Sequence, residues 1–167
     1  MKTRKIIRIC LWTAFAVYGL ALIYILFWSR IGRFPYGSFW EYVKYSVNLI
    51  PFKTVWGYVE DYIAKRGLWI IGLAIRNIGG NFILFFPMGI FLPCLFPKTR
   101  KFRVTAQVSF CTILSVELTQ LLLRRGIFDV DDLILNVSGW LIGFAMLRIP
   151  FFHKILKKFF ILPCEEN

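Results

Sequence analysis

The chain has 167 residues, of which 58% are hydrophobic and 19% aromatic, and its mean hydropathy is +0.64. These values exceed those of an ordinary soluble domain, and the apolar residues come in long runs, so residues 1–167 are predicted to form a single all-α integral membrane domain. The net charge of +12 would suggest nucleic-acid binding in a soluble protein, but in a membrane protein it marks topology and attraction to anionic lipids, which argues against nucleic acid as a partner.

Four apolar runs approach the roughly 20 residues that a helix needs to cross the hydrocarbon layer. They are predicted to be transmembrane helices at about residues 6–28, 77–96, 104–123 and 133–149. The first run has a basic flank, but it is longer than the apolar part of a secretory signal and no cleavage site follows it. We therefore expect it to be retained as a span.

Lysine and arginine concentrate in three segments outside these spans, residues 2–8, 98–103 and 148–158. By the positive-inside rule these segments face the cytoplasm, so both termini are predicted to be cytoplasmic. The basic tail, residues 150–167, includes an amphipathic stretch that is expected to lie on the cytoplasmic leaflet and to contact membrane lipids.

The segment between the first two spans, residues 29–76, is crowded with Phe, Tyr and Trp, which favour the head-group zone of a bilayer. After the breaker NLIPF, apolar residues recur at helical spacing up to Ile63, which predicts a helix lying flat on the outer leaflet. Two roles fit this helix, a membrane anchor and a lid over an outward-opening cavity. The fold class is thus four transmembrane helices with an external aromatic-rich interfacial segment.

The second predicted span carries Asn77 and Asn81 one helical turn apart. An asparagine at such a position needs a polar partner, so Asn81 is a candidate site residue. Glycines favour close approach of a neighbouring helix, and this is expected for Gly89 in the second span and for the pair Gly139 and Gly143 in the fourth.

On the third predicted span, Glu117, Gln120 and Arg124 stand at i, i+3 and i+7 and share one face. A charged group at the centre of a span carries a penalty of about 2.5–3.5 kcal/mol on insertion scales, so this face is expected to point into the bundle. The hairpin RRGIFDVDD follows, and Gly126 is expected to end the helix.

Three aspartates, Asp129, Asp131 and Asp132, collect at the start of the fourth span, where the positive helix end favours carboxylates. Asp129 or Asp131 is expected to cap that helix. Asn136 follows Asp132 at i+4 and extends its face toward the glycine pair.

These side chains predict a polar ligand-binding cluster near the outer face of the membrane, made of Asn81, Glu117, Gln120, Arg125, Asp129, Asp132 and Asn136. Arg124 is the alternative to Arg125 as its arginine. A network of this kind can also serve only to fix helix register, but the cluster has more polar groups than a register device requires. Asp129, Asp132 and Glu117 suit a divalent ion, but the nearby arginines weaken that motif, so neither a metal nor a cofactor is predicted.

Four motifs resemble those of the VanZ-like family of bacterial membrane proteins, whose founding member is associated with resistance to the glycopeptide teicoplanin. They span residues 48–143 and are NLIPF, GNFILFFPMGIFLP, ELTQLLLRRGIFDVDD and NVSGWLIG. One departure is that two residues, Gly126 and Ile127, separate Arg125 from the Phe-Asp pair. The resemblance implies a small multi-pass protein of the bacterial plasma membrane, with a family core at about residues 48–149, and it supplies no reaction.

The cluster and the resemblance favour a non-enzymatic protein that binds or shields an amphiphilic cell-envelope ligand, either a lipid-linked precursor or a lipoglycopeptide antibiotic. One alternative is an intramembrane enzyme that modifies an envelope lipid with Glu117 and Asp132 as an acid/base pair. It would lack a Ser-His or Cys-His nucleophile, because the only histidine, His153, lies in the tail. The other alternative is a structural or partner-binding membrane protein.

Overall fold

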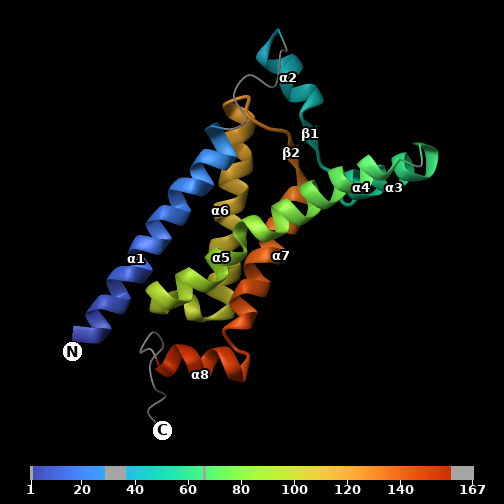
Figure 1. Cartoon of the computed structure of the whole chain (residues 1–167). Helices are drawn as coiled ribbons and strands as arrows, with labels where there is room; N and C mark the ends of the chain where they lie inside the picture. Colours follow the sequence, from blue (N-terminus) through green and yellow to red (C-terminus); the bar gives the residue numbers. More distant parts are fainter. Residues whose placement is uncertain (1, 29–36, 66, 159–167) are drawn as a thin grey trace.

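The computed structural model describes residues 2–28, 37–65 and 67–158, and nearly all of them are helical (Figure 1). The elements in chain order are α1 (Lys2–Ile23), the π-helix η1 (Tyr24–Trp28), α2 (Phe39–Tyr45), β1 (Val47–Asn48), α3 (Lys53–Lys65), α4 (Leu68–Ala74), the π-helix η2 (Ile75–Gly79), α5 (Gly80–Leu95), the 3-10 helix η3 (Pro97–Arg100), α6 (Phe102–Leu122), β2 (Phe128–Asp129), α7 (Val130–Met146) and α8 (Pro150–Lys158).

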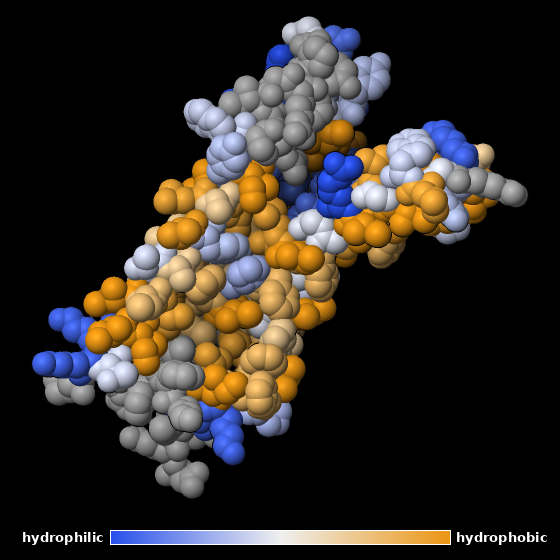
Figure 2. Space-filling model, viewed as in Figure 1, coloured by the Kyte–Doolittle hydropathy of each residue, from blue (hydrophilic) through white to orange (hydrophobic). Residues whose placement is uncertain are grey.

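Helices α1, α5, α6 and α7 form a bundle, and α3 and α4 form an arm that projects from one end of it (Figure 1). We call this the arm end, and it also carries α2, β1 and β2. The start of α1 and helix α8 lie together at the opposite end. Apolar residues cover most of the visible face of the bundle, and strongly hydrophilic ones gather at its ends and where the arm meets it (Figure 2).

Two helices are long and apolar enough to cross a membrane, Lys5–Trp28 and Leu68–Leu95. The second is continuous through α4, η2 and α5, so it begins well before the predicted start at residue 77. Helices α7 and α8 pass the same test only as a pair bent by 67°. By length and composition the described residues thus hold two or three candidate spans. A total of four spans stays a prediction.

Helix α6 coincides with the predicted third span but is not one of these candidates, because its polar side chains lower its hydropathy. These polar side chains divide between two faces. Thr105, Ser109, Glu117 and Gln120 are buried in the bundle, whereas Gln107, Ser115 and Thr119 are exposed. The burial of Glu117 and Gln120 agrees with the inward face predicted for them. Helix α3 covers the predicted interfacial helix, and none of its residues is buried.

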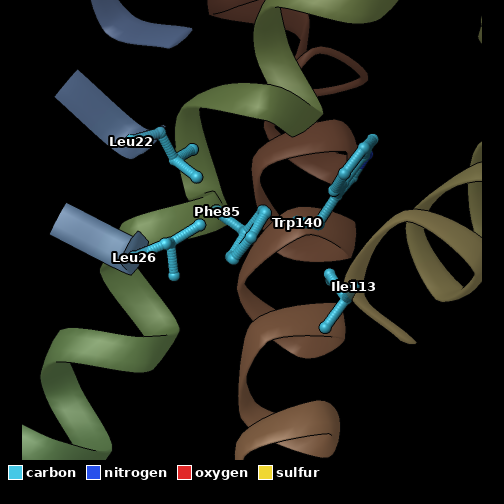
Figure 3. Close-up of a cluster of buried hydrophobic side chains, with 5 residues drawn as sticks. All are labelled: Leu22, Leu26, Phe85, Ile113 and Trp140. Atoms are coloured by element: carbon cyan, nitrogen blue, oxygen red, sulfur yellow. The ribbon is translucent and has the colours of Figure 1, made fainter. Parts of the chain in front are cut away.

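The core of the bundle brings together side chains from α1, η1, α5, α6 and α7 (Figure 3). They are Leu22, Leu26, Phe85, Ile113 and Trp140. The rings of Phe85 and Trp140 stack with an interplanar angle of 10° and centroids 6.3 Å apart. This contact joins α5 to α7, the pair of helices that makes the most extensive packing in the molecule.

The glycines predicted to allow close helix contact do so. A Cβ added at Gly139 would lie 1.9 Å from the carbonyl oxygen of Phe82, and one at Gly143 would lie 2.1 Å from that of Phe86. Gly89 on α5 faces the carbonyl oxygen of Trp140 at 2.0 Å in the same way. Any side chain at these three positions would force the α5 and α7 backbones apart.

Replacing Gly139 or Gly143 with alanine is therefore expected to destabilise the folded protein by at least about 1–3 kcal/mol, the range for overpacking a core. The measurement is the thermal unfolding midpoint of the purified protein in a neutral maltoside detergent. Gly19→Ala is the matched control, because an added Cβ there meets nothing within 4 Å, and alanine in a helix should be neutral or stabilising by up to about 1 kcal/mol. Equal midpoints for the test and control variants would contradict the close crossing.

Candidate functional site

A short parallel strand pair ties the NLIPF segment to the FDVDD segment at the arm end. Val47 pairs with Phe128 and Asn48 with Asp129. The Phe128 backbone N–H also donates to the carbonyl oxygen of Ser46 at 2.8 Å. Two motifs that lie about 80 residues apart in the sequence therefore start the site side by side.

Asp129 joins three segments through its carboxylate. As the N-cap of α7, it accepts a hydrogen bond from the backbone N–H of Asp131 at 2.9 Å. It also accepts from the Nδ2 of Asn48 at 3.0 Å and from the hydroxyl of Thr54. The predicted cap is confirmed, and its remaining lone pairs hold the loop and the first turn of α3.

Asp131 caps a second helix from a distance. Its buried carboxylate accepts the backbone N–H groups of Phe52, of Thr54 at 2.8 Å and of Val55 at 3.3 Å, which are orphan donors at the amino end of α3. Phe52 has a φ of 64°, in the left-handed region, and this turn aims the three N–H groups at the carboxylate. An anion at this end also complements the helix dipole.

The carboxyl end of the first span is held by α6 and the hairpin after it. Gln120 donates through Nε2 to the carbonyl oxygen of Leu26 at 2.9 Å, and Arg125 donates through Nη1 to that of Phe27 at 3.3 Å. Both acceptors belong to the π-helix η1. The last carbonyls of a helix lack partners within the helix, so these two side chains supply them.

Helix α6 ends two residues earlier than predicted. Arg124 adopts the left-handed conformation that stops it, with a φ of 53°, whereas the sequence pointed to Gly126. The Arg125 backbone N–H then bonds to the carbonyl oxygen of Gln120 at 2.7 Å, and the Arg124 N–H bonds to that of Leu121 at 3.1 Å. As a result the Arg124 guanidinium lies over the ring of Phe39, and Arg125 turns toward η1.

Two cavities adjoin at the arm end. The first has a volume of about 550 Å³ and is lined by Tyr45, Val47, Asn48, Lys53, Thr54, Tyr58, Asn77, Arg125, Gly126, Ile127, Asp129 and Asp132. The second has a volume of about 420 Å³ and is lined by Ile25, Tyr58, Leu73, Arg76, Asn77, Gly80, Asn81 and Leu84. Tyr58 and Asn77 line both, so the cavities meet at these two side chains.

The seven predicted site residues fall into two groups. Arg125, Asp129 and Asp132 line the first cavity. Asn81 lines the second cavity and donates through Nδ2 to the carboxylate of Asp132, and Asn136 donates through Nδ2 to the backbone carbonyl of Asp132 at 2.7 Å. This group therefore clusters around Asp132.

Glu117 and Gln120 form the second group. Both are buried on α6, and neither is among the residues that line the two cavities. Gln120 serves the end of η1, as described above. An acid/base pair must reach one reacting atom. Of the predicted pair, Asp132 lines the first of these two cavities and Glu117 lines neither.

A metal role for the carboxylates has little room in this geometry. Across residues 2–28, 37–65 and 67–158, no three His, Cys, Asp or Glu side chains converge as cation ligands. Both carboxylate oxygens of Asp129 already accept hydrogen bonds from the chain.

Several cavity residues were not among the predicted site residues. Lys53, Tyr58, Asn77 and Arg76 line the two cavities beside the predicted residues. The signal that could have found Lys53 is the NLIPF motif, which places it directly after the turn. Tyr58 lies one helical turn beyond Thr54 on α3. The hydrogen bond from Thr54 to Asp129 brings this face of the helix toward the cavity.

Burial raises the pKa of the Tyr58 hydroxyl above its usual value. The negative charges of Asp132 and Asp129 raise it further, whereas Arg76 lowers it. The Tyr58 side chain therefore keeps its O–H, and remains a hydrogen-bond donor at the junction of the cavities, at any physiological pH.

Replacing Asp131 with alanine is expected to release the amino end of α3, because three backbone N–H groups lose their acceptor. The expected local loss is about 1–3 kcal/mol, measured as faster hydrogen exchange at the amides of Thr54 and Val55. Asp131→Asn keeps one acceptor oxygen, so its exchange rates at these amides should fall between those of the wild type and Asp131→Ala. The control Asp61→Ala removes an exposed carboxylate on the same helix, which pairs with Lys65, and should leave exchange at those amides unchanged; an equal effect of both variants would contradict the cap.

Because its pKa is raised, Tyr58 is expected to ionise above the ordinary tyrosine value of 10.0. The sign follows from linkage: the folded state binds this proton more tightly, so stability falls as pH rises from about 10 through the folded-state pKa. The measurement is an alkaline absorbance titration of the wild type minus that of Tyr58→Phe. Asp132→Asn should lower the midpoint of this difference curve, and a midpoint at the ordinary value in the wild type would contradict the burial.

The VanZ/LLP1 family model matches residues 15–153. The match extends from α1 into α8 and includes every element that lines the two cavities. No curated protein and no solved structure shows a comparable match. The match confirms the resemblance that the four motifs indicated, and this chain belongs to the VanZ/LLP1 family.

Proposed function

We propose that the protein is a multi-pass protein of the bacterial plasma membrane that binds an amphiphilic cell-envelope ligand in the two adjoining cavities. The ligand is a lipid-linked cell-wall precursor or a lipoglycopeptide antibiotic, and its capture is linked to glycopeptide resistance. Family membership supports the membrane setting and the link to resistance. The chemistry of the cavities supports the kind of ligand.

The change of lining from one cavity to the next carries this proposal. The first cavity has charged walls, with Lys53, Arg125, Asp129 and Asp132. The second has one charged side chain, Arg76, beside the polar groups near the junction, and it adds the apolar side chains of Ile25, Leu73 and Leu84. An amphiphile has a polar head and an apolar tail, so it matches this sequence of surfaces.

The position of the cavities supports access from the outer side of the membrane. Their lining residues come mainly from the segments of the arm end, which lies opposite the start of α1 and helix α8 (Figure 1). The lysine and arginine residues of that opposite end favour a cytoplasmic position for it by the positive-inside rule. The arm end then faces the side from which both cell-wall precursors and glycopeptides are met.

The proposal predicts that blocking the second cavity weakens binding of tailed ligands. Gly80 lines that cavity, and a Cβ added to it meets nothing within 4 Å, so Gly80→Leu is expected to extend its side chain into the space. We expect this variant to bind teicoplanin, which has an acyl tail, at least tenfold more weakly than the wild type, because burying a leucine-sized tail contributes about 1.5–3 kcal/mol. Binding is measured by equilibrium titration in maltoside micelles.

The matched control is Gly79→Leu, because Gly79 also has open space around its Cβ but lines neither cavity. Vancomycin, which lacks the tail, serves as the second control and should bind weakly to all variants. Unchanged teicoplanin affinity in Gly80→Leu would contradict the tail site. The link to resistance is tested separately, by comparing teicoplanin susceptibility of cells that express the wild type, Gly80→Leu or Gly79→Leu.

A further inference from the structure

We propose that the ligand head bound at the junction of the two cavities is a phosphate or diphosphate group, so that the ligand is a phosphorylated lipid. This inference rests on the proposed function and narrows it, since a lipoglycopeptide of the teicoplanin type carries no phosphate. The reason is that the acceptors of the cavity walls already bind other parts of the protein, whereas most cationic donors of the walls do not.

The acceptors of the cavity walls are largely used by the chain itself. Asp129 accepts from Asn48, from Thr54 and from the backbone N–H of Asp131. Asp132 accepts from Asn81. These two carboxylates thus already serve to hold the protein together.

The cationic donors of the walls are largely unused. Lys53 and Arg76 make no hydrogen bond or ion pair with any part of the chain that the structure describes. Arg125 uses one of its five N–H groups on the carbonyl oxygen of Phe27. Three positive side chains therefore face the cavities with donors to offer, and a phosphate supplies several charged acceptor oxygens.

These cations stand on both sides of the junction. Lys53 and Arg125 line the first cavity, and Arg76 lines the second. Tyr58 and Asn77 lie between them because they line both cavities. The charge of Arg76 acts on Tyr58, as do those of Asp132 and Asp129. An anion at the junction would have positive groups on either side and the Tyr58 O–H as a neutral donor.

Asn77 adds a reason to expect a polar group next to the phosphate. Its Oδ1 is buried and has no hydrogen-bond partner among the described residues. A buried acceptor left without a donor is costly. A hydroxyl or amide hydrogen on a sugar attached to the phosphate would satisfy it, while the lipid tail extends along Ile25, Leu73 and Leu84.

The test compares ligands that share one tail and differ in the head. Farnesyl phosphate, farnesyl diphosphate and farnesol are titrated into the full-length protein in maltoside micelles, together with inorganic diphosphate, which has no tail. We expect the two phosphorylated lipids to bind at least tenfold more tightly than farnesol, and inorganic diphosphate to bind more weakly than farnesyl diphosphate.

Charge removal at the junction should abolish that preference. Lys53→Gln and Arg76→Gln are each expected to weaken farnesyl diphosphate binding about tenfold, the effect of losing one charge-assisted hydrogen bond, and to leave farnesol binding unchanged. Arg76→Lys should retain most of the affinity. The matched control is Lys65→Gln, which removes the same charge from the other end of α3, where Lys65 pairs with Asp61 outside both cavities.

The outcomes separate this inference from the broader proposal. If farnesol binds as tightly as farnesyl diphosphate, or if only teicoplanin binds, the phosphate assignment is overturned and an amphiphile site remains. If inorganic diphosphate binds as tightly as farnesyl diphosphate, the phosphate site stands and the tail site of the proposed function falls. Full affinity in Lys53→Gln and Arg76→Gln would overturn the placement at the junction.

Discussion

The site depends on one buried carboxylate, that of Asp131, which holds the amino end of α3 against the start of α7. Without this contact the first turn of α3 would keep the bond from Thr54 to Asp129 but lose its three backbone bonds to α7, so Lys53 and Tyr58 would be held less firmly beside Asp132. The carboxylate is buried, but the three N–H groups it accepts and the dipole of α3 offset the cost of removing its charge from water. Asp129 also holds α3 close to α7 through its hydrogen bonds with Asn48 and Thr54. The two aspartates together therefore fix one wall of the first cavity.

The second constraint is the glycine-lined crossing of α5 and α7. Because Gly139 and Gly143 let the backbone of α7 approach the carbonyl oxygens of Phe82 and Phe86, Asn81 comes within hydrogen-bonding reach of Asp132. One helix crossing thus fixes both the core, through the Phe85 and Trp140 rings, and the wall shared by the cavities.

Those features that depend on local spacing could be predicted from the sequence. The shared buried face of Glu117 and Gln120 and the close contact at Gly139 and Gly143 follow from helical periodicity. The preference for a carboxylate at a helix start narrowed the cap to Asp129 or Asp131, and the structure has Asp129 there. The partners of Asp131 could not be found in this way, because they lie 76 to 79 residues away and are backbone groups, which leave no trace in residue identity. The helix end at Arg124 was missed for a related reason: glycine is the usual residue at a left-handed stop, and the rings of Phe39 and Tyr42, which receive the Arg124 guanidinium, come from a distant segment. The grouping of Lys53, Tyr58, Asn77 and Arg76 required the arm to be placed in three dimensions.

The continuous helix from Leu68 to Leu95 has 28 residues, which corresponds to a length of about 42 Å. The hydrocarbon layer of a typical bilayer is about 30 Å thick. If Leu95 marks one boundary of that layer, Arg76 lies about 28 Å along the helix axis, at the other boundary. The length of this helix therefore sets the height of the cavity junction relative to the lipid. A head group held there would sit level with the phosphates of the surrounding membrane, while its tail stays among the acyl chains.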